Sequence, residues 1–150
     1  MGNIFSMSCR KKITSEKLVV QLQEINTRRF LSKFIIKQEE NVWYFSFAKQ
    51  NLFSLILSSE HKIQTKHARQ NWAFWVQSVF MNELALHYKG RLSDEGIEGS
   101  WTGDVKKYPT IQSWYGELVS IDKDDPLFTE LFNLNLRLVP DFLIELGIKL

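Results

Sequence analysis

The chain has 150 residues, 44% of them hydrophobic and 24% charged, which is the balance of a single folded domain and excludes a disordered segment. The single cysteine excludes an internal disulfide and so a disulfide-stapled secreted scaffold, and we expect a cytoplasmic protein. The net charge of +2 is unevenly spread, because residues 1–70 carry 12 Lys and Arg against 5 Asp and Glu, and residues 71–150 carry 7 against 12. The halves either present a basic and an acidic face or pack together and neutralise each other.

The first twelve residues are predicted to be a flexible tail ahead of a single globular domain at 13–150. The chain opens with Met1-Gly2-Asn3-Ile4-Phe5-Ser6, which fits the M-G-x-x-x-[ST] pattern for myristoylation of Gly2. One myristoyl chain binds membranes only marginally, so stable attachment needs a second signal. Cys9 is a candidate for palmitoylation, and the run Arg10-Lys11-Lys12 is a candidate contact for anionic lipid.

The first five residues also resemble the start of the ADP-ribosylation-factor GTPases, which begin with a myristoylated glycine. This resemblance implies acylation alone. The phosphate-binding loop of a GTPase is missing from the sequence, so neither the fold nor the activity of that family carries over.

A capped amphipathic helix is predicted to begin at Thr14-Ser15, because Leu18, Leu22 and Ile25 follow at helical spacing. The apolar pattern then changes phase, and we expect the helix to break near Asn26–Thr27.

Residues 33–58 are ambiguous between strand and helix. Trp43, Phe45 and Phe47 alternate with smaller or more polar neighbours, which favours a small β-hairpin near 33–47. The short apolar run at 52–57 does not distinguish the two structures by periodicity.

Residues 64–88 give the clearest predicted helix, free of Gly and Pro and apolar around almost its whole circumference. Gly90 marks its end. Shorter helices are predicted at 110–120, 125–136 and 140–146. Together these elements predict a mainly α fold, a compact helical bundle around the helix at 64–88, with an α+β fold as the alternative if the hairpin forms.

The segment Lys89–Lys107 is predicted to be a long loop, and long loops in compact domains commonly bind ligands or partners. It holds four of the seven glycines but no phosphate-binding pattern. The other interpretation is a solvated connector. The candidate binding residues in this loop are Arg91, Asp94, Glu95, Glu98, Trp101 and Asp104.

Glu83 and His87 lie four residues apart, so they share one face of the predicted helix. A carboxylate beside an imidazole can act as a general base or as half of a metal site, although such a pair is commonly structural. The other histidines add no recognisable ligand spacing, so we expect neither a metal nor another cofactor.

A basic stripe is predicted where Arg29, Lys33 and Lys37 would align on one helix face, with Arg28 beside them. Such a stripe can neutralise phosphates, but it matches no named nucleic-acid module. An ordinary solvated face is the alternative.

These patterns favour a non-enzymatic helical interaction or adaptor module that binds a protein partner and is tethered to a membrane surface through its acylated amino terminus. A small enzyme or ligand-binding domain that uses the 89–107 loop with Glu83 and His87 is one alternative. A basic nucleic-acid accessory protein that uses residues 28–37 is another.

Replacing Gly2 by Ala is expected to move the protein from the membrane to the soluble fraction, because the transferase acylates only an amino-terminal glycine. The measurement is partitioning between pelleted membranes and supernatant in eukaryotic cells, with intact mass to detect the acyl group. Unchanged partitioning of the Gly2→Ala protein would rule out this tether.

Overall fold

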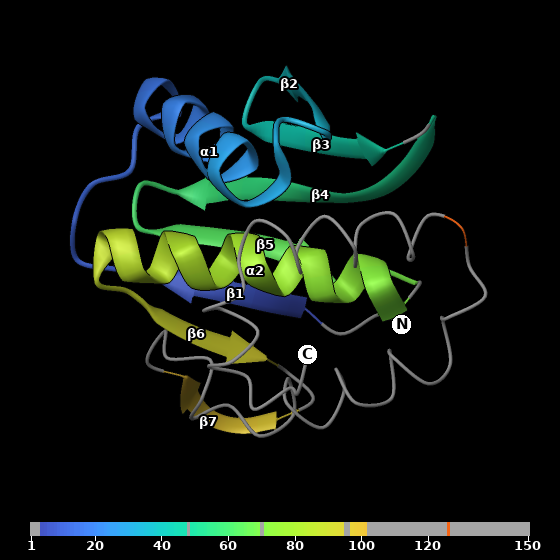
Figure 1. Ribbon diagram of the computed structural model, residues 1–150. Helices are drawn as coiled ribbons and strands as arrows, with labels where there is room; N and C mark the ends of the chain where they lie inside the picture. Colours follow the sequence, from blue (N-terminus) through green and yellow to red (C-terminus); the bar gives the residue numbers. More distant parts are fainter. Residues whose placement is uncertain (1–3, 48, 70, 95–96, 102–125, 127–150) are drawn as a thin grey trace.

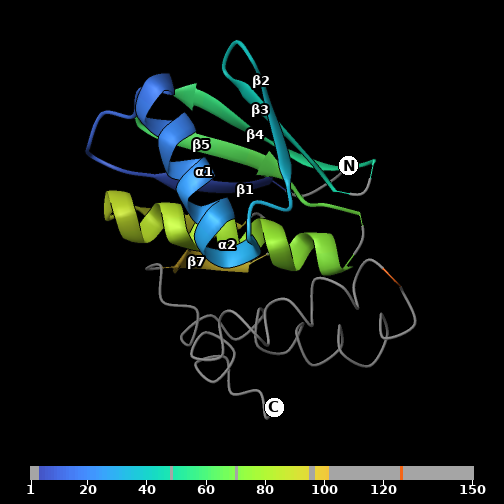
Figure 2. The same cartoon turned by 45° about the horizontal axis from the view of Figure 1, so that its top comes forward.

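The computed structural model of the chain describes residues 4–47, 49–69, 71–94, 97–101 and 126. The described part forms one seven-stranded antiparallel sheet, with the strands in the spatial order β2-β3-β4-β5-β1-β6-β7, and two helices on one of its faces (Figures 1 and 2). The elements are β1 (Ile4–Ser8), α1 (Ser15–Phe30), β2 (Ile35–Glu39), β3 (Val42–Phe47), β4 (Gln50–Ser59), β5 (Lys62–Lys66), α2 (Asn71–Tyr88), β6 (Arg91–Asp94) and β7 (Ile97–Trp101).

The predicted helical bundle is therefore wrong. The fold is built on the sheet: residues 52–58, which the sequence left ambiguous, lie on β4, and residues 64–66, predicted to begin the long helix, end β5. In β5, Ile63 and Thr65 are buried while Lys66 faces solvent, which is the two-residue period of a half-buried strand. The β-hairpin expected near 33–47 is present as β2 and β3, and its Trp43 and Phe45 are buried.

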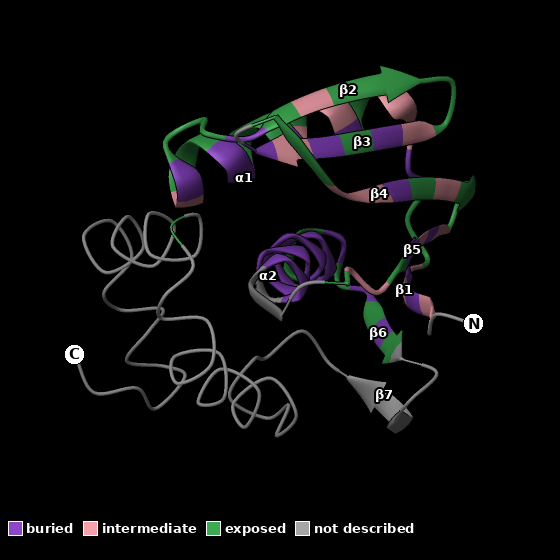
Figure 3. Ribbon diagram, turned by 90° about the vertical axis from the view of Figure 1, so that its right-hand side faces the viewer, coloured by how far each residue is buried: buried purple, intermediate pink, exposed green. Residues whose placement is uncertain are grey.

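Helix α2 lies in the hollow of the curved sheet, as Figure 3 shows in a view along the helix. Val76, Phe80, Met81 and Leu84 are fully buried, so the helix is surrounded on most sides. It begins seven residues later than predicted, because residues 62–66 join the sheet as β5. The three helices predicted between 110 and 146 lie outside the described residues, except for Pro126, which is helical.

No helix in the part of the chain that the structure describes is both long enough and apolar enough to cross a membrane.

Residues 4–8, predicted to belong to a flexible tail, instead form β1 in the interior of the sheet, between β5 and β6. Phe5 pairs with Thr65 of β5, Met7 pairs with Leu92 of β6, and both Phe5 and Met7 are fully buried. Five residues are too few to identify a strand from local pattern alone, and β1 is defined by its two partners.

Helix α1 runs unbroken to Phe30, so the break predicted near Asn26–Thr27 is wrong. The apolar stripe changes phase there because the helix changes neighbours: Phe30 stacks on Phe80 of α2 with the ring centroids 5.5 Å apart. The helix ends at Leu31, which adopts the left-handed conformation with a φ of 48°.

Asn26 is buried at this end of α1 and joins the helix to the start of β2. Its Nδ2 donates a hydrogen bond to the carbonyl oxygen of Phe34 at 2.8 Å, and the Phe34 amide donates to Asn26 Oδ1 at 3.3 Å. Phe34 is itself buried, so these main-chain groups depend on the asparagine.

Replacing Asn26 by Ala is expected to lower the free energy of unfolding by about 2–4 kcal/mol, because it leaves two buried main-chain groups without a partner. Asn41→Ala is the matched control: the exposed Asn41 side chain donates one hydrogen bond to the carbonyl of Leu57, and its loss should cost about 1 kcal/mol or less. Urea unfolding measures both variants, and equal losses would contradict this role of Asn26.

Candidate functional site

Glu83 and His87 do not pair with each other. Each contacts α1: Glu83 is bound by Arg28 and Arg29, with Arg28 Nη2 at 2.9 Å from Oε2 and Arg29 Nε at 2.8 Å from Oε1. The amide nitrogen of Gln21 donates a hydrogen bond to Nε2 of His87 at 2.5 Å. The two residues thus link α2 to α1 side by side.

The electrostatics of Glu83 favour a structural role. Burial alone would raise the pKa of its carboxyl, but the hydrogen bond and charge of Arg28 and the charge of Arg29 outweigh burial and hold that pKa below its usual range. A pocket of about 280 Å³ between the helices is lined by both Glu83 and His87. The carboxylate that faces it is ionised and already bound to two guanidinium groups, which makes it a poor general base.

The predicted basic stripe of Arg28, Arg29, Lys33 and Lys37 is not a continuous surface on one helix. The two arginines lie in the last turn of α1 and bind Glu83, whereas Lys37 lies on β2 beyond the turn at Leu31. The structure therefore does not bring these four residues together as one face for nucleic acid.

The predicted loop at 89–107 is partly a hairpin. Arg91 and Asp94 lie on β6, Glu98 and Trp101 lie on β7, and Leu92 is buried opposite Met7. The glycines of this segment indicated a loop, but β6 pairs with β1, a strand distant in the sequence, and this pairing makes the segment part of the sheet. The remaining candidates of this segment lie outside the described residues: Glu95 and Asp104.

The amino-terminal candidates are separated by β1. Gly2 lies outside the described residues, before the first residue of the strand, and Cys9 follows its last residue. Five residues of strand span roughly 17 Å. Residues 4–8, between the two predicted signals, therefore belong to the sheet and not to a flexible tail.

Cys9 is half-buried and its thiol is engaged. Its Sγ donates a hydrogen bond to the carbonyl of Lys11 at 3.2 Å. Burial raises the pKa of the thiol, with the hydrogen bond and charge of Lys11 opposing the rise. A thiol that holds its proton is a weak nucleophile, so Cys9 is a less suitable acylation site than the sequence suggested.

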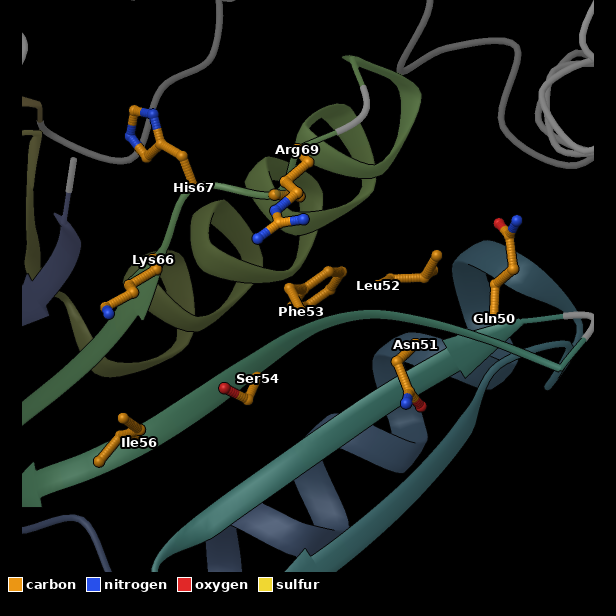
Figure 4. A pocket seen from close by; sticks show the side chains of 10 residues that line it. Gln50, Asn51, Leu52, Phe53, Ser54, Ile56, Lys66, His67 and Arg69 are labelled. Carbon is orange, nitrogen blue, oxygen red and sulfur yellow. The ribbon is translucent and has the colours of Figure 1, made fainter. Parts of the chain in front are cut away.

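A cleft that the sequence did not indicate lies where β4 separates from β5 (Figure 4). Its volume is about 840 Å³, in the range of ligand-binding sites. Its lining residues come from β4, from the end of β5 and from the connection to α2: Gln50, Asn51, Leu52, Phe53, Ser54, Ile56, Lys66, His67, Ala68 and Arg69.

The cleft exists because β4 is twice as long as β5. β4 pairs with β3 along Gln50–Ile56, but its pairing with β5 begins only at Ile56. In the described part of the chain, no strand pairs with the β5 side of residues 50–55. Thr65 Oγ1 closes the gap locally by donating a hydrogen bond to the carbonyl of Ser54 at 2.6 Å.

Gln77 of α2 binds the end of β5 and the connection that follows it, beside the cleft. Its Nε2 donates hydrogen bonds to Thr65 Oγ1 and to the carbonyl of Lys66, each at 2.6 Å. Its Oε1 accepts a hydrogen bond from the Ala68 amide at 3.1 Å. Gln77 is fully buried, so these main-chain groups are satisfied by a side chain where a neighbouring strand would otherwise satisfy them.

The cleft is basic above an apolar floor. Lys66 and Arg69 are exposed, and neither forms an ion pair within the residues described. The residues that line the cleft include no carboxylate. Phe53, at the floor, stacks on Phe45 with ring centroids 4.6 Å apart. The sequence signal was the basic run from Lys66 to Arg69, which was hidden within the predicted long helix.

Comparison of the chain with protein-family models, with curated proteins and with solved structures gives no match. The geometry of the described residues therefore carries the functional argument.

Protonation of Glu83 is expected to weaken the fold at acid pH. Because its pKa is lowered on folding, its ion pairs stabilise the protein fully above the unfolded value of about 4.3, and this contribution is lost as the pH falls through the lower folded value. Glu83→Gln should lower the free energy of unfolding by about 2–4 kcal/mol at neutral pH, and its difference in stability from the wild type should shrink below about pH 4.

Urea unfolding at a series of pH values measures this difference. Glu60→Gln is the control, because Glu60 forms an exposed ion pair with Lys12 and should change the free energy of unfolding by about 0.5 kcal/mol or less throughout. A Glu83→Gln difference that does not change with pH would contradict the prediction.

Proposed function

We propose that the protein is a non-enzymatic interaction module that binds an extended, acidic segment of a partner protein in the β4–β5 cleft. One observation carries this proposal: the unpaired half of β4, residues 50–55, borders a cleft whose cations Lys66 and Arg69 have no counter-charge among the described residues. The binding of the Glu83 carboxylate by two arginines is a reason to prefer this function to an enzyme.

The main chain of β4 is suited to accept another strand. Leu57 donates its amide hydrogen bond to Asn41 on the β3 side, so the alternating residues Ile56 and Ser54 direct their main-chain groups toward β5. There Ile56 pairs with Gln64 and the Ser54 carbonyl accepts a hydrogen bond from the Thr65 hydroxyl. Beyond Ile56, β5 no longer pairs with this edge. An unpaired edge of this kind is the surface to which extended peptides add in β-augmentation.

Side chains of the cleft support an acidic and partly apolar partner. Carboxylates on the added segment would face Lys66 and Arg69, and charge complementarity of this kind sets both specificity and association rate. Alternate residues of an extended segment point to opposite faces, so apolar side chains between the acidic ones would contact Leu52 and Phe53.

Acylation of Gly2 remains part of the proposal, because the acceptor pattern at Met1–Ser6 supports it. A myristoyl group there would attach the interaction module to a cytoplasmic membrane surface at the start of β1. Since one such chain binds only marginally, attachment would be reversible.

Peptides selected for binding from a displayed random library are expected to have acidic residues that alternate with apolar residues. Lys66→Glu combined with Arg69→Glu should weaken the affinity for a selected peptide by at least about tenfold, because two attractive contacts become repulsive. The matched control, Lys17→Glu with Lys33→Glu, makes the same change in net charge at exposed positions outside the cleft and should have little effect.

Hydrogen exchange with the selected peptide bound tests the main-chain contact. Exchange of the Ser54 amide should slow, whereas that of Leu55, which lies on the β3-facing side of the alternation, should not change. Failure to select any peptide, or equal weakening by both double variants, would contradict binding in the cleft. Binding without slower exchange at Ser54 would contradict strand addition.

A further inference from the structure

A second cavity, of about 650 Å³, lies where the end of β1 meets the end of α2, at the left of the view in Figure 1. Three segments that are far apart in the sequence form its walls: the end of β1 with the residues after it, the end of α2, and the start of β6. The lining residues are Ser8, Cys9, Arg10, Lys11, Tyr88, Lys89 and Arg91.

Four of these seven residues are cations and none is acidic. Arg10, Lys11, Lys89 and Arg91 are all exposed, and none forms an ion pair within the described part of the chain. Lys62 adds a fifth positive charge nearby, because Lys62 and Arg91 pair with Ser8 from its two sides in the sheet. Like charges gathered in this way repel one another, and a bound anion would remove that cost.

The loop that carries Arg10 and Lys11 is held firmly against the β4–β5 turn. The Cys9 amide donates a hydrogen bond to the His61 carbonyl at 3.0 Å, and the Ile13 amide donates to the Glu60 carbonyl at 2.7 Å. His61 Nδ1 lies 3.1 Å from the Lys11 carbonyl, so it donates a third hydrogen bond. Three hydrogen bonds, at Cys9, Lys11 and Ile13, therefore hold the main chain of this loop in place.

The opposite wall is equally constrained. Lys89 has a φ of 54°, and the Gly90 amide then donates a hydrogen bond to the Ala85 carbonyl at 2.8 Å, which ends α2. A Cβ atom at Gly90 would collide with the Met7 side chain and lie 2.8 Å from the Ser8 carbonyl. Only glycine permits β1 and the end of α2 to approach this closely, so Lys89 and Arg91 are fixed relative to β1.

Tyr88 lines the cavity between these walls, and its side chain is 96% buried, with 4% exposed. Its hydroxyl lies close to the Gln21 side chain of α1, although the two do not form a hydrogen bond of good geometry in the structure described. Burial raises the pKa of the phenol, while the nearby Gln21 side chain opposes the rise, so the group keeps its proton and can donate.

We propose that this cavity binds a phosphate-bearing ligand, either a free phosphate ester or anhydride or the phosphate of an anionic lipid headgroup. Two arginines provide planar forks that match phosphate oxygens, and the two lysines add point charges. Because the main chain that carries the cations is held in place before the ligand arrives, only their side chains need to be ordered on binding. The site is separate from the β4–β5 cleft and does not depend on the function proposed for that cleft.

Calorimetry with pyrophosphate at low salt tests this site in the full-length, unacylated protein. We expect saturable binding at one site, weakened at least about tenfold by Arg10→Gln with Arg91→Gln, since each substitution removes a charge-assisted contact. The matched control, Lys17→Gln with Lys33→Gln, removes the same charge at exposed positions outside the cavity and should retain the wild-type affinity. Tyr88→Phe, which keeps the ring, should weaken binding by a smaller factor.

Vesicles of phosphatidylcholine, with and without phosphatidic acid, distinguish the two sources of phosphate. A lipid headgroup would be identified if the protein sediments with vesicles that contain phosphatidic acid, if the Arg10→Gln, Arg91→Gln double variant does not, and if pyrophosphate displaces the wild-type protein from the vesicles. Pyrophosphate binding without sedimentation would identify a soluble phosphate. The proposal is overturned if neither probe binds, or if the Lys17 and Lys33 control weakens binding as much as the arginine pair does.

Discussion

The pairing of β1 with both β5 and β6 is the contact on which the rest of the structure depends. Its two buried side chains, Phe5 and Met7, lie against α2, and its main chain joins the β6–β7 hairpin to the other strands. The same strand separates the residue that would be acylated, Gly2, from the basic loop after Cys9. It also places that loop beside the end of α2, so the second cavity is a direct consequence of this pairing.

Three buried polar side chains on the helices fulfil main-chain or charge requirements that the sheet does not meet. Asn26 binds both main-chain groups of Phe34, Glu83 binds two arginines of α1, and Gln77 bridges β5 and the connection that follows it. A buried polar group without a partner lowers the stability of the fold, so each of these side chains favours the one arrangement of elements in which its partners are present. For Gln77 that geometry is the end of β5 and the connection at residues 66–68, which line the candidate binding cleft, so one wall of the cleft depends on the packing of α2.

Both candidate sites draw on the basic first half of the chain. β5 runs from Lys62, near the phosphate cavity, to Lys66, at the β4–β5 cleft, and four residue steps of strand correspond to roughly 13 Å. Five of the 12 Lys and Arg in residues 1–70 thus lie around the two ends of this strand: Arg10, Lys11, Lys62, Lys66 and Arg69. Charge of one sign near both sites favours acidic and phosphate-bearing partners and makes association with them sensitive to salt.

Local physics in the sequence determined several elements: the cap at Thr14, whose Oγ1 accepts the Lys17 amide, the hairpin of alternating aromatics at 33–47, and the burial of the helix that Gly90 ends. Those features depend on residues within a few positions of one another. Only the tertiary structure decided that the fold is a sheet, because short strands such as β1 and β5 are defined by distant partners. The positions of the two candidate sites also depend on the tertiary structure. Lys89 and Arg10 line one cavity, and Lys66 lies beside β4, although these residues are far apart in the sequence.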